Sequence, residues 1–205
     1  MNYKTLVKKQ TLTRLITQLK ENGITAEVVA TGNEALEKIK SYIPQGASVM
    51  NGSSTTLQQI GFVDYLKGTT HGWNNLHAAI IAEKNPEKQA ALRQQAVFSD
   101  YYLGSAHAVT EAGELVIASA SGSQLPHLVY TSSNIILVVG AQKIVPTLED
   151  ALQRIKEHVF PLEDARMKSV GYGGSVLAKL LVLFREPAMM KRTVRVIFVD
   201  EVLGF

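Results

Sequence analysis

The stretch Asn134–Gly140, "NIILVVG", is the most strand-like segment of the chain, which has 205 residues. Residues 135–139 within it are apolar without interruption. A strand with one face in water alternates apolar and polar residues, whereas a continuous apolar run is typical of a parallel sheet with helices on both faces. This stretch therefore predicts an α/β fold built around a buried central strand.

Predicted helices and strands alternate on both sides of this strand. By hydrophobic periodicity we expect helices at residues 12–19, 33–43, 86–100, 148–159 and 175–184, and strands at 24–30, 47–50 and 193–199. Thr31 with Glu34, and Thr147 with Asp150, have the spacing of N-terminal helix caps. The alternation predicts an α/β protein with a mostly parallel open sheet and helices on both faces.

The chain reads as one domain over residues 1–205, because it contains no internal repeat, no low-complexity tract and no linker-like segment. Residues 1–30 supply an N-terminal helix and strand, whose place in the core the pattern does not fix. Residues 103–127 differ in texture from the rest. They hold two apolar stretches joined by the turn Glu111–Glu114, followed by a loop rich in glycine and serine.

Charge and composition exclude several classes of function. The net charge is only +3, and no run of Lys and Arg with interleaved aromatic residues predicts nucleic-acid binding. No apolar run approaches the roughly 20 residues that span a bilayer, so membrane insertion is not expected. The first residues lack the pattern of a secretory signal, and a cytoplasmic location is therefore expected.

The chain contains no cysteine. This excludes disulfides, thiolate catalysis and an iron–sulfur cluster held by this chain alone. His71 and His77 are six residues apart, which is not the i, i+4 spacing of a metal-binding pair on a helix. No metal site is expected.

A glycine and four hydroxyl residues follow the predicted strand at 47–50, in the sequence "ASVMNGSSTTLQQIGF". The first turn of a helix has unpaired N–H groups and partial positive charge, and glycine lets a ligand approach the backbone. We therefore expect Gly52, Ser53, Ser54 and Thr55 to bind an anion. The alternative is that one serine simply caps the helix.

Two further loops have a similar composition. Ser121, Gly122 and Ser123 follow a predicted strand, and Gly174 with Ser175 precede a predicted helix. In an open α/β sheet the loops at the carboxyl ends of the strands gather in one crevice. If these loops converge there, they form a pocket for a small carboxylate or phosphate; the alternative is that each is an ordinary loop.

Glu111 is the candidate catalytic acid, because it lies at a turn between two apolar strands beside Gly113. The alternative is an exposed turn residue without a catalytic role. His107 and His127 flank this turn and the Gly/Ser loop, and an imidazole beside a bound carboxylate is suited to acid–base chemistry near neutral pH. We therefore expect His127 to act in catalysis, and His107 and Gly113 to contact the ligand.

The segments "NGSSTTLQQIGF", "SAHAVTEAGELVIASASGSQLPHLVYTSSNIILVVGAQKIVPTLEDAL" and "GYGGSVLAKLLV" together resemble the LUD domain, the lactate-utilisation family, over about residues 31–205. The most specific part is Ala106–Leu152, with its Leu-Pro-His at 125–127 and Ile-Val-Pro at 144–146. The resemblance implies a fold similar to ribose-5-phosphate isomerase, glucosamine-6-phosphate deaminase and the CoA transferases. In those relatives a glycine- and hydroxyl-rich loop after a strand commonly binds phosphate or carboxylate, and CoA transferases use a glutamate as nucleophile.

The chain departs from the family pattern in two places. Larger members carry a ferredoxin-like segment with clustered cysteines, which is absent here. Members often read Gly-Pro-Ser followed by Thr and an acidic residue, whereas this chain reads Gly173-Gly174-Ser175-Val176 with no acid before Glu186.

Lactate oxidation removes two electrons, which no side chain of this composition accepts, and no G-x-G-x-x-G follows a strand. The leading hypothesis is a lactate-utilisation-type domain that binds a small organic anion and acts with redox partner subunits. Iron–sulfur or flavin cofactors then belong to those partners, and none to this chain alone. Two alternatives stay open: a free-standing isomerase, hydrolase or transferase using Glu111, and a non-catalytic ligand-sensing or scaffold protein. A homo-oligomer is compatible with each.

Overall fold

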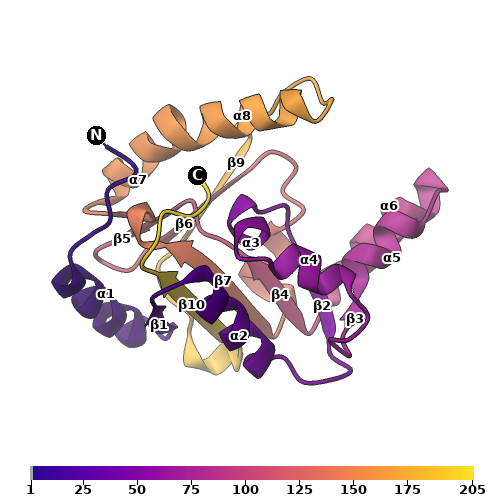
Figure 1. Ribbon diagram of the computed structural model, residues 1–205, viewed down its shortest axis with the longest axis horizontal. Helices are drawn as coiled ribbons and strands as arrows, with labels where there is room; N and C mark the ends of the chain where they lie inside the picture. Colours follow the sequence, from indigo (N-terminus) through magenta and orange to yellow (C-terminus); the bar gives the residue numbers. More distant parts are fainter. Residues whose placement is uncertain (1) are drawn as a thin grey trace.

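The computed structural model describes residues 2–205, and Met1 lies outside the described residues. Its larger sheet has six strands in the order β1-β10-β7-β4-β2-β3, and every neighbouring pair is parallel (Figure 1). These strands are β1 (Thr25–Val29), β2 (Ser48–Asn51), β3 (Asn74–Asn75), β4 (Tyr101–Gly104), β7 (Asn134–Gly140) and β10 (Thr193–Val199). The predicted α/β class with a mostly parallel sheet is confirmed.

Strand β7 is the predicted central strand. It pairs with β10 from Asn134 to Gly140 and with β4 on its other side. Its side chains alternate between two cores: Ile135, Leu137 and Val139 lie in one, while Ile136 and Val138 lie in the other. Both faces are therefore covered, which is why the run is apolar at every position, and each buried side chain contributes ~1.5–3 kcal/mol.

Helices cover both faces of this sheet. The helices are α1 (Lys9–Glu21), α2 (Gly32–Tyr42), α3 (Thr55–Gln59), α4 (Phe62–Lys67), α5 (Leu76–Ala82), α6 (Pro86–Gln95), α7 (Leu148–Arg154) and α8 (Phe160–Ser169). Helix α1 packs on one face, whereas α2, α3 and α4 pack on the other. The short 3₁₀ turns are η1 (Ala96–Phe98), η3 (Ala141–Lys143) and η5 (Ala188–Met190), and the π-helical segments are η2 (His127–Thr131) and η4 (Ile155–Val159).

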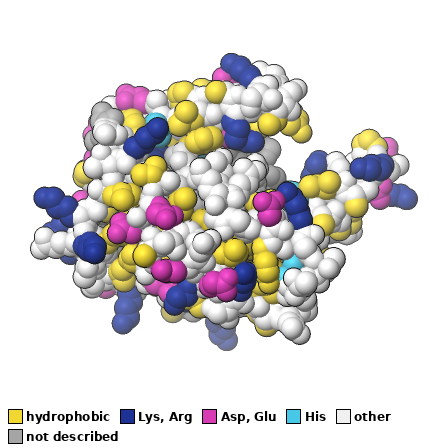
Figure 2. Space-filling model, viewed as in Figure 1, with side chains coloured by type: hydrophobic (Ala, Val, Ile, Leu, Met, Phe, Trp, Pro, Cys, Tyr) yellow, Lys and Arg dark blue, Asp and Glu magenta, His cyan; other side chains and the backbone are white. Residues whose placement is uncertain are grey.

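The predicted helix caps are present. The Glu34 N–H donates to the Thr31 hydroxyl at the start of α2, and Thr147 with Asp150 forms a reciprocal capping box at the start of α7. Helices α5 and α6 project away from the sheet, and α6 buries none of its residues (Figures 1 and 2). No helix within residues 2–205 combines the length and the apolar character that crossing a bilayer requires.

A second, four-stranded sheet has the order β8-β5-β6-β9. Its strands are β5 (Ala108–Thr110), β6 (Leu115–Ser119), β8 (Ile144–Val145) and β9 (Lys179–Leu183). Strands β5 and β6 form an antiparallel hairpin around the predicted turn Glu111–Glu114. The helix expected at residues 175–184 is wrong, because this segment contains β9, which pairs antiparallel with β6 from Lys179 to Leu183. A short apolar run fits either structure, and here tertiary pairing decides.

The N-terminal helix and strand are joined to the core. Strand β1 pairs with β10 at the edge of the large sheet, and Leu12, Leu15 and Leu19 of α1 lie in the same apolar core as alternate residues of β7. Helix α1 therefore covers the face of the sheet that also contacts the smaller sheet through Val109, Leu115 and Ile117, which share that core.

Candidate functional site

Four loops meet at the carboxyl edge of the large sheet. They follow β2 (residues 52–54, leading into α3), β4 (residues 105–107), β7 (residues 141–143) and β10 (residues 200–205). Because β2, β4, β7 and β10 are parallel, their carboxyl ends all face the same way. Figure 1 shows the yellow C-terminal segment passing beside α3 at this edge, in agreement with the hydrogen bond from the Gly204 N–H to Gln59.

Lys143 lies at the centre of these loops. Its side chain is buried at the end of η3, three residues after β7 ends. The ammonium group donates to the hydroxyl of Thr56 (3.0 Å) and to the hydroxyl of Ser105 (3.2 Å). Thr56 lies in the first turn of α3, which follows β2, and Ser105 lies in the loop after β4, so Lys143 connects the segments that follow three strands.

Arg154 is a second buried cation at this site. It ends α7, whose apolar stripe packs against β5 and β8 of the smaller sheet, and its side chain is 0% exposed. Among residues 2–205, none of its three guanidinium nitrogens has a hydrogen-bond partner. Its guanidinium carbon lies 5.7 Å from the centre of the Tyr3 ring, in a cation–π contact.

Neither cation has an anionic partner within residues 2–205. The ion pairs of this part of the chain involve other side chains, and the described contacts of Lys143 are to hydroxyls. Burial and, to a smaller extent, the nearby Arg154 charge together lower the pKa of Lys143 to about 7. Burial likewise lowers the pKa of Arg154 to about 10. We call Lys143 and Arg154 the cation pair.

His107 adds a neutral donor beside the cation pair. The Ala118 N–H donates to His107 Nδ1 (3.1 Å), so in the neutral ring the hydrogen is on Nε2. Burial lowers the pKa of His107 to about 3, and the charges of Lys143 and Arg154 lower it in the same direction. His107 is therefore neutral at physiological pH, and its Nε2–H is the donor of the ring.

The C-terminal segment, residues 203–205, covers Lys143. Gln142 donates from Nε2 to the Leu203 carbonyl (2.8 Å) and accepts from the Leu203 N–H (3.3 Å). The backbone at Gly204 then passes over Thr56 and Lys143 so closely that an added β-carbon would lie 2.9 Å from Lys143 Nζ and overlap the Thr56 hydroxyl. Access of a ligand to Lys143 therefore requires this segment to move.

Replacing Gly204 with alanine should detach the C-terminal segment. The φ of Gly204 is +64°, and a β-carbon there also meets Thr56 and Lys143. We expect hydrogen exchange at the Leu203 and Gly204 amides to be faster and the protein to be destabilised by about 1–2 kcal/mol. The matched control is Gly46→Ala, where φ is +80° and no atom lies within 4 Å of the added carbon. Equal exchange in both variants would contradict the covering role of this segment.

The glycine- and hydroxyl-rich loop after β2 lies beside the cation pair, but its groups are largely used. The Gly52 N–H is paired with the Leu103 carbonyl (3.2 Å), and the Ser54 hydroxyl caps α3 by accepting from the Leu57 N–H. Ser53 is exposed and Thr55 begins α3, which has only five residues. Thr56 is therefore the hydroxyl of this run that contacts Lys143.

The other predicted ligand loops lie at different places. Ser121 and Ser123 are exposed and bond to each other, and Gly122 packs against the Lys179 side chain. The neighbouring Gln124 reaches back to Gly52, so this loop borders the loop after β2. In contrast, the predicted pair Gly174 and Ser175 bonds to α8, where the Ser175 N–H donates to the Asp164 carboxylate (2.8 Å) and a β-carbon at Gly174 would meet Asp164.

The predicted catalytic residues are apart from the cation pair and from each other. Glu111 is exposed, 4.0 Å from Arg14 on α1, and Gly113 packs against Asn22 at the end of α1. His127 is buried in η2, and the hydroxyls of Ser132 and Ser99 are 2.8 and 3.3 Å from its Nδ1. Ser99 and Ser132 lie two residues before β4 and β7 begin. They are therefore at the amino edge of the large sheet, opposite the edge at which Lys143 lies.

The His127 side chain is buried between the Tyr102 ring and two serine hydroxyls. Its ring stacks on Tyr102 with ring centres 4.5 Å apart, and burial lowers the pKa of His127 to about 4. Burial also raises the pKa of Tyr102. The structure therefore brings His107 and the segment 52–56, through Thr56 of α3, to the cation pair, but does not bring Glu111, Gly113 or His127 there.

The cation pair itself was not among the sequence candidates. Lys143 comes three residues after the most apolar strand of the chain. This position predicts that its side chain lies at the carboxyl edge of the sheet, where ligands bind in open α/β sheets. Arg154 is three residues after Ala151 and one before Ile155, so it falls on the apolar stripe of its helix. A cation on an apolar stripe is a detectable anomaly.

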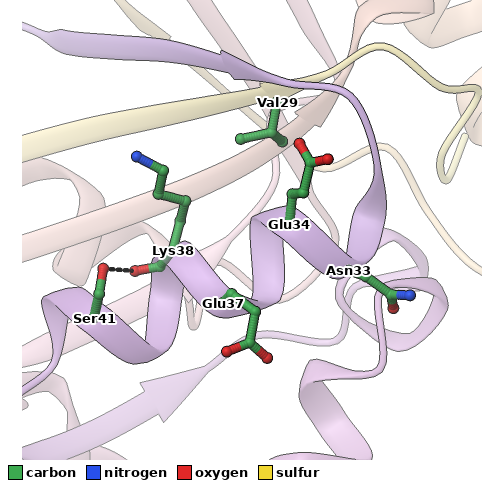
Figure 3. Close-up of a pocket in the computed structure, with 6 residues that line it drawn as sticks. All are labelled: Val29, Asn33, Glu34, Glu37, Lys38 and Ser41. Atoms are coloured by element: carbon green, nitrogen blue, oxygen red, sulfur yellow. Dashed lines mark hydrogen bonds between the residues drawn. The ribbon is translucent and has the colours of Figure 1, made fainter.

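One surface depression lies on α2, and Lys143 and Arg154 are not among the residues that line it. Figure 3 shows an open depression on α2 where Glu34, Glu37 and Lys38 surround Val29, with the Ser41 hydroxyl donating to the Lys38 carbonyl. Glu34 is already used, because it accepts from the Ala30 N–H. This acidic surface does not suit an anion. Within residues 2–205 no three His, Asp or Glu side chains gather as a metal-binding set.

The fold and the site together define an α/β protein with a mostly parallel sheet, a buried lysine at the carboxyl edge of that sheet and a buried arginine near it, neither of which has an anionic partner within residues 2–205. The chain belongs to the LUD domain family, whose model matches residues 12–173. This family is associated with lactate utilisation.

A solved structure supports the fold. The crystal structure of a DUF162 family protein from Deinococcus radiodurans at 1.70 Å resolution is similar, with a TM-score of 0.56 and 12% sequence identity, covering 96% of this chain and 100% of that chain. At this identity the likeness concerns the fold alone. Among proteins with curated descriptions, none matches this chain.

Proposed function

We propose that this protein binds a small organic carboxylate at the cation pair and serves lactate utilisation together with redox partner subunits. The observation that carries the proposal is the burial of Lys143 and Arg154 without an anionic partner in residues 2–205. A buried, unpaired charge costs several kcal/mol, which a bound carboxylate offsets. A protein that keeps such a destabilising cation is expected to use it to bind an anionic ligand.

The residue types suit a carboxylate. The planar guanidinium of Arg154 offers a fork of donors that matches two carboxylate oxygens, and the Lys143 ammonium adds a point charge. The hydroxyls of Thr56 and Ser105, together with His107 Nε2, provide hydrogen bonds for a neighbouring hydroxyl or carbonyl oxygen. A 2-hydroxy acid such as lactate carries both groups on adjacent carbons.

The electrons of lactate oxidation need a separate acceptor. Oxidising a hydroxyl to a ketone removes two electrons, and a flavin, nicotinamide or iron–sulfur group must receive them. This chain has no cysteine to ligate a cluster. In this proposal the protein therefore holds the anion, and partner subunits supply the redox group.

Thermal denaturation with added ligand tests the proposal. We expect L-lactate or pyruvate at about 100 times its Kd to stabilise the protein by ~2.7 kcal/mol, which raises Tm by about 5–10 °C. Because the pKa of free Lys143 is about 7, the protonated fraction of Lys143, and with it the ligand affinity, should fall by up to roughly 30-fold between pH 6 and pH 8.5. Arg154→Met should abolish the stabilisation.

The control for this variant is Arg93→Met, since Arg93 is exposed on α6 and has no ion pair or side-chain hydrogen bond within the described chain. Phosphate and chloride at matched ionic strength separate carboxylate binding from a general salt effect. The proposal fails when neither carboxylate shifts Tm, or when Arg154→Met responds as the wild type does.

A further inference from the structure

Lys143 has the surroundings of a reactive amine. Its side chain is 3% exposed, and its described contacts are hydroxyls rather than carboxylates. Burial and the Arg154 charge lower the pKa of Lys143 to about 7, so about half of this side chain is a neutral amine at pH 7. A neutral amine has a free electron pair and is a nucleophile toward carbonyl carbon.

We propose that Lys143 forms an imine with the ketone carbon of a small 2-oxo acid whose carboxylate is held by Arg154. This inference rests on the proposed function, and it names the class of substrate and the atom that it meets. A 2-oxo acid carries a carboxylate next to a ketone, so both buried groups have a matching partner. A 2-hydroxy acid lacks the ketone and binds without reacting.

The step balances without an oxidant or reductant. The Lys143 Nζ electron pair attacks the ketone carbon, a C–N bond forms, and the C–O double-bond electrons move to oxygen. A proton passes from nitrogen to that oxygen, giving a carbinolamine. The hydroxyl group then leaves as water, after taking up a second proton, while the nitrogen loses its remaining proton and the C=N bond forms.

The neighbouring hydroxyls suit these proton transfers. Thr56 and Ser105 lie 3.0 and 3.2 Å from Nζ, and each hydroxyl both donates and accepts. They are therefore placed to carry the proton from nitrogen to the developing alkoxide. Arg154, with no hydrogen-bond partner in residues 2–205, remains available to orient the carboxylate.

Reductive trapping tests the inference. The intact protein is incubated with pyruvate and sodium cyanoborohydride at pH 7, and the product is analysed by intact mass and by peptide mapping. We expect one carboxyethyl group per chain, located on Lys143, formed at least about tenfold faster than on any exposed lysine. L-Lactate under the same conditions should give no adduct.

Three variants sharpen the test. Lys143→Arg keeps a cation but should give no adduct, Arg154→Met should slow labelling about tenfold or more at low pyruvate concentration, and Lys156→Met should be labelled as the wild type is. Lys156 is a matched control because it is exposed and two residues from Arg154. Labelling that is spread evenly over exposed lysines overturns the inference.

The two proposals fail separately. Pyruvate that raises Tm through Arg154 but leaves no adduct on Lys143 overturns the imine and leaves carboxylate binding intact. Pyruvate that neither raises Tm nor labels Lys143 overturns both. Labelling of the wild type at Lys143, together with a Lys143→Arg variant that still gains a Tm increase from pyruvate but is not labelled, supports both proposals.

Discussion

Replacing Arg154 with methionine is expected to raise the melting temperature of the ligand-free protein. The guanidinium is 0% exposed and none of its nitrogens has a hydrogen-bond partner among the described residues. Methionine has a similar length and no charge, so it fills the space without the desolvation cost. Against this gain stands the loss of the contact with the Tyr3 ring, worth about 0.5–1 kcal/mol.

The net gain should be about 1–3 kcal/mol, or an increase in Tm of roughly 2–4 °C for each kcal/mol. Urea unfolding at pH 7 without ligand measures it. Arg93→Met should stay within about 0.5 kcal/mol of the wild type, because Arg93 is exposed. Destabilisation of Arg154→Met by several kcal/mol would show that Arg154 has a structural partner and would remove the basis for a ligand there.

This prediction has an unusual combination of signs. Replacing a residue that stabilises the fold lowers the stability of the protein. Replacing a buried residue that is kept for a ligand raises the stability of the ligand-free protein. Arg154→Met should therefore raise Tm without ligand and lower the response to ligand. No purely structural role of Arg154 produces both changes, because a structural cation would have a partner in the chain.

The architecture of the large sheet was predictable because its signals are local. The uninterrupted apolar run of β7 requires cover on two faces, and the residues around it alternate between helix and strand patterns. The caps of α2 and α7 depend on residues three apart, so they too are visible in the sequence. The family resemblance stated from the motifs agrees with the match over residues 12–173.

The smaller sheet was harder to predict because its pairing is long-range. Strand β9 joins β6 across a separation of more than sixty residues in the register Leu115↔Leu183, and nothing in "KLLVL" distinguishes this strand from a helical turn. Antiparallel pairing with a buried neighbour decides the outcome, which is a tertiary rather than a local effect.

In the candidate site, too, the features with local sequence signals were predictable and those that depend on long-range contacts were not. The rule that loops gather at the carboxyl edge predicts the meeting of the loops after β2, β4 and β7. The sequence does not show that Lys143 and Arg154 lack a carboxylate partner within residues 2–205, because this depends on which residues surround them in the folded chain. Glu111, chosen for its place in a turn, instead faces Arg14 on α1. The catalytic roles of Glu111 and His127 stay predictions.

The pH dependence of stability provides the second large effect. The pKa of Lys143 is about 7 in the folded chain and ~10.4 in an unfolded chain. Between these values the unfolded chain binds a proton that the folded chain does not. The free energy of unfolding therefore rises with pH from about pH 7, by up to ~1.4 kcal/mol per pH unit, and the penalty for the buried charge is fully present below pH 7.

Lys143→Met should remove this slope. We expect the difference in unfolding free energy between wild type and Lys143→Met to change by on the order of 2 kcal/mol between pH 7 and pH 9, in the direction of a relatively more stable wild type at high pH. Urea unfolding at several pH values measures it, and stopping at pH 9 keeps Arg154, whose pKa is lowered to about 10, charged.

Lys156→Met is the control, because Lys156 is an exposed lysine, on η4, without the burial of Lys143. Its curve should run parallel to the wild type across this range. Saturating carboxylate should flatten the wild-type slope, since a bound anion favours the charged amine and raises its pKa. A slope that is the same in wild type and Lys143→Met would mean that Lys143 keeps its proton, and would remove both the pH-dependent binding and the reactive amine.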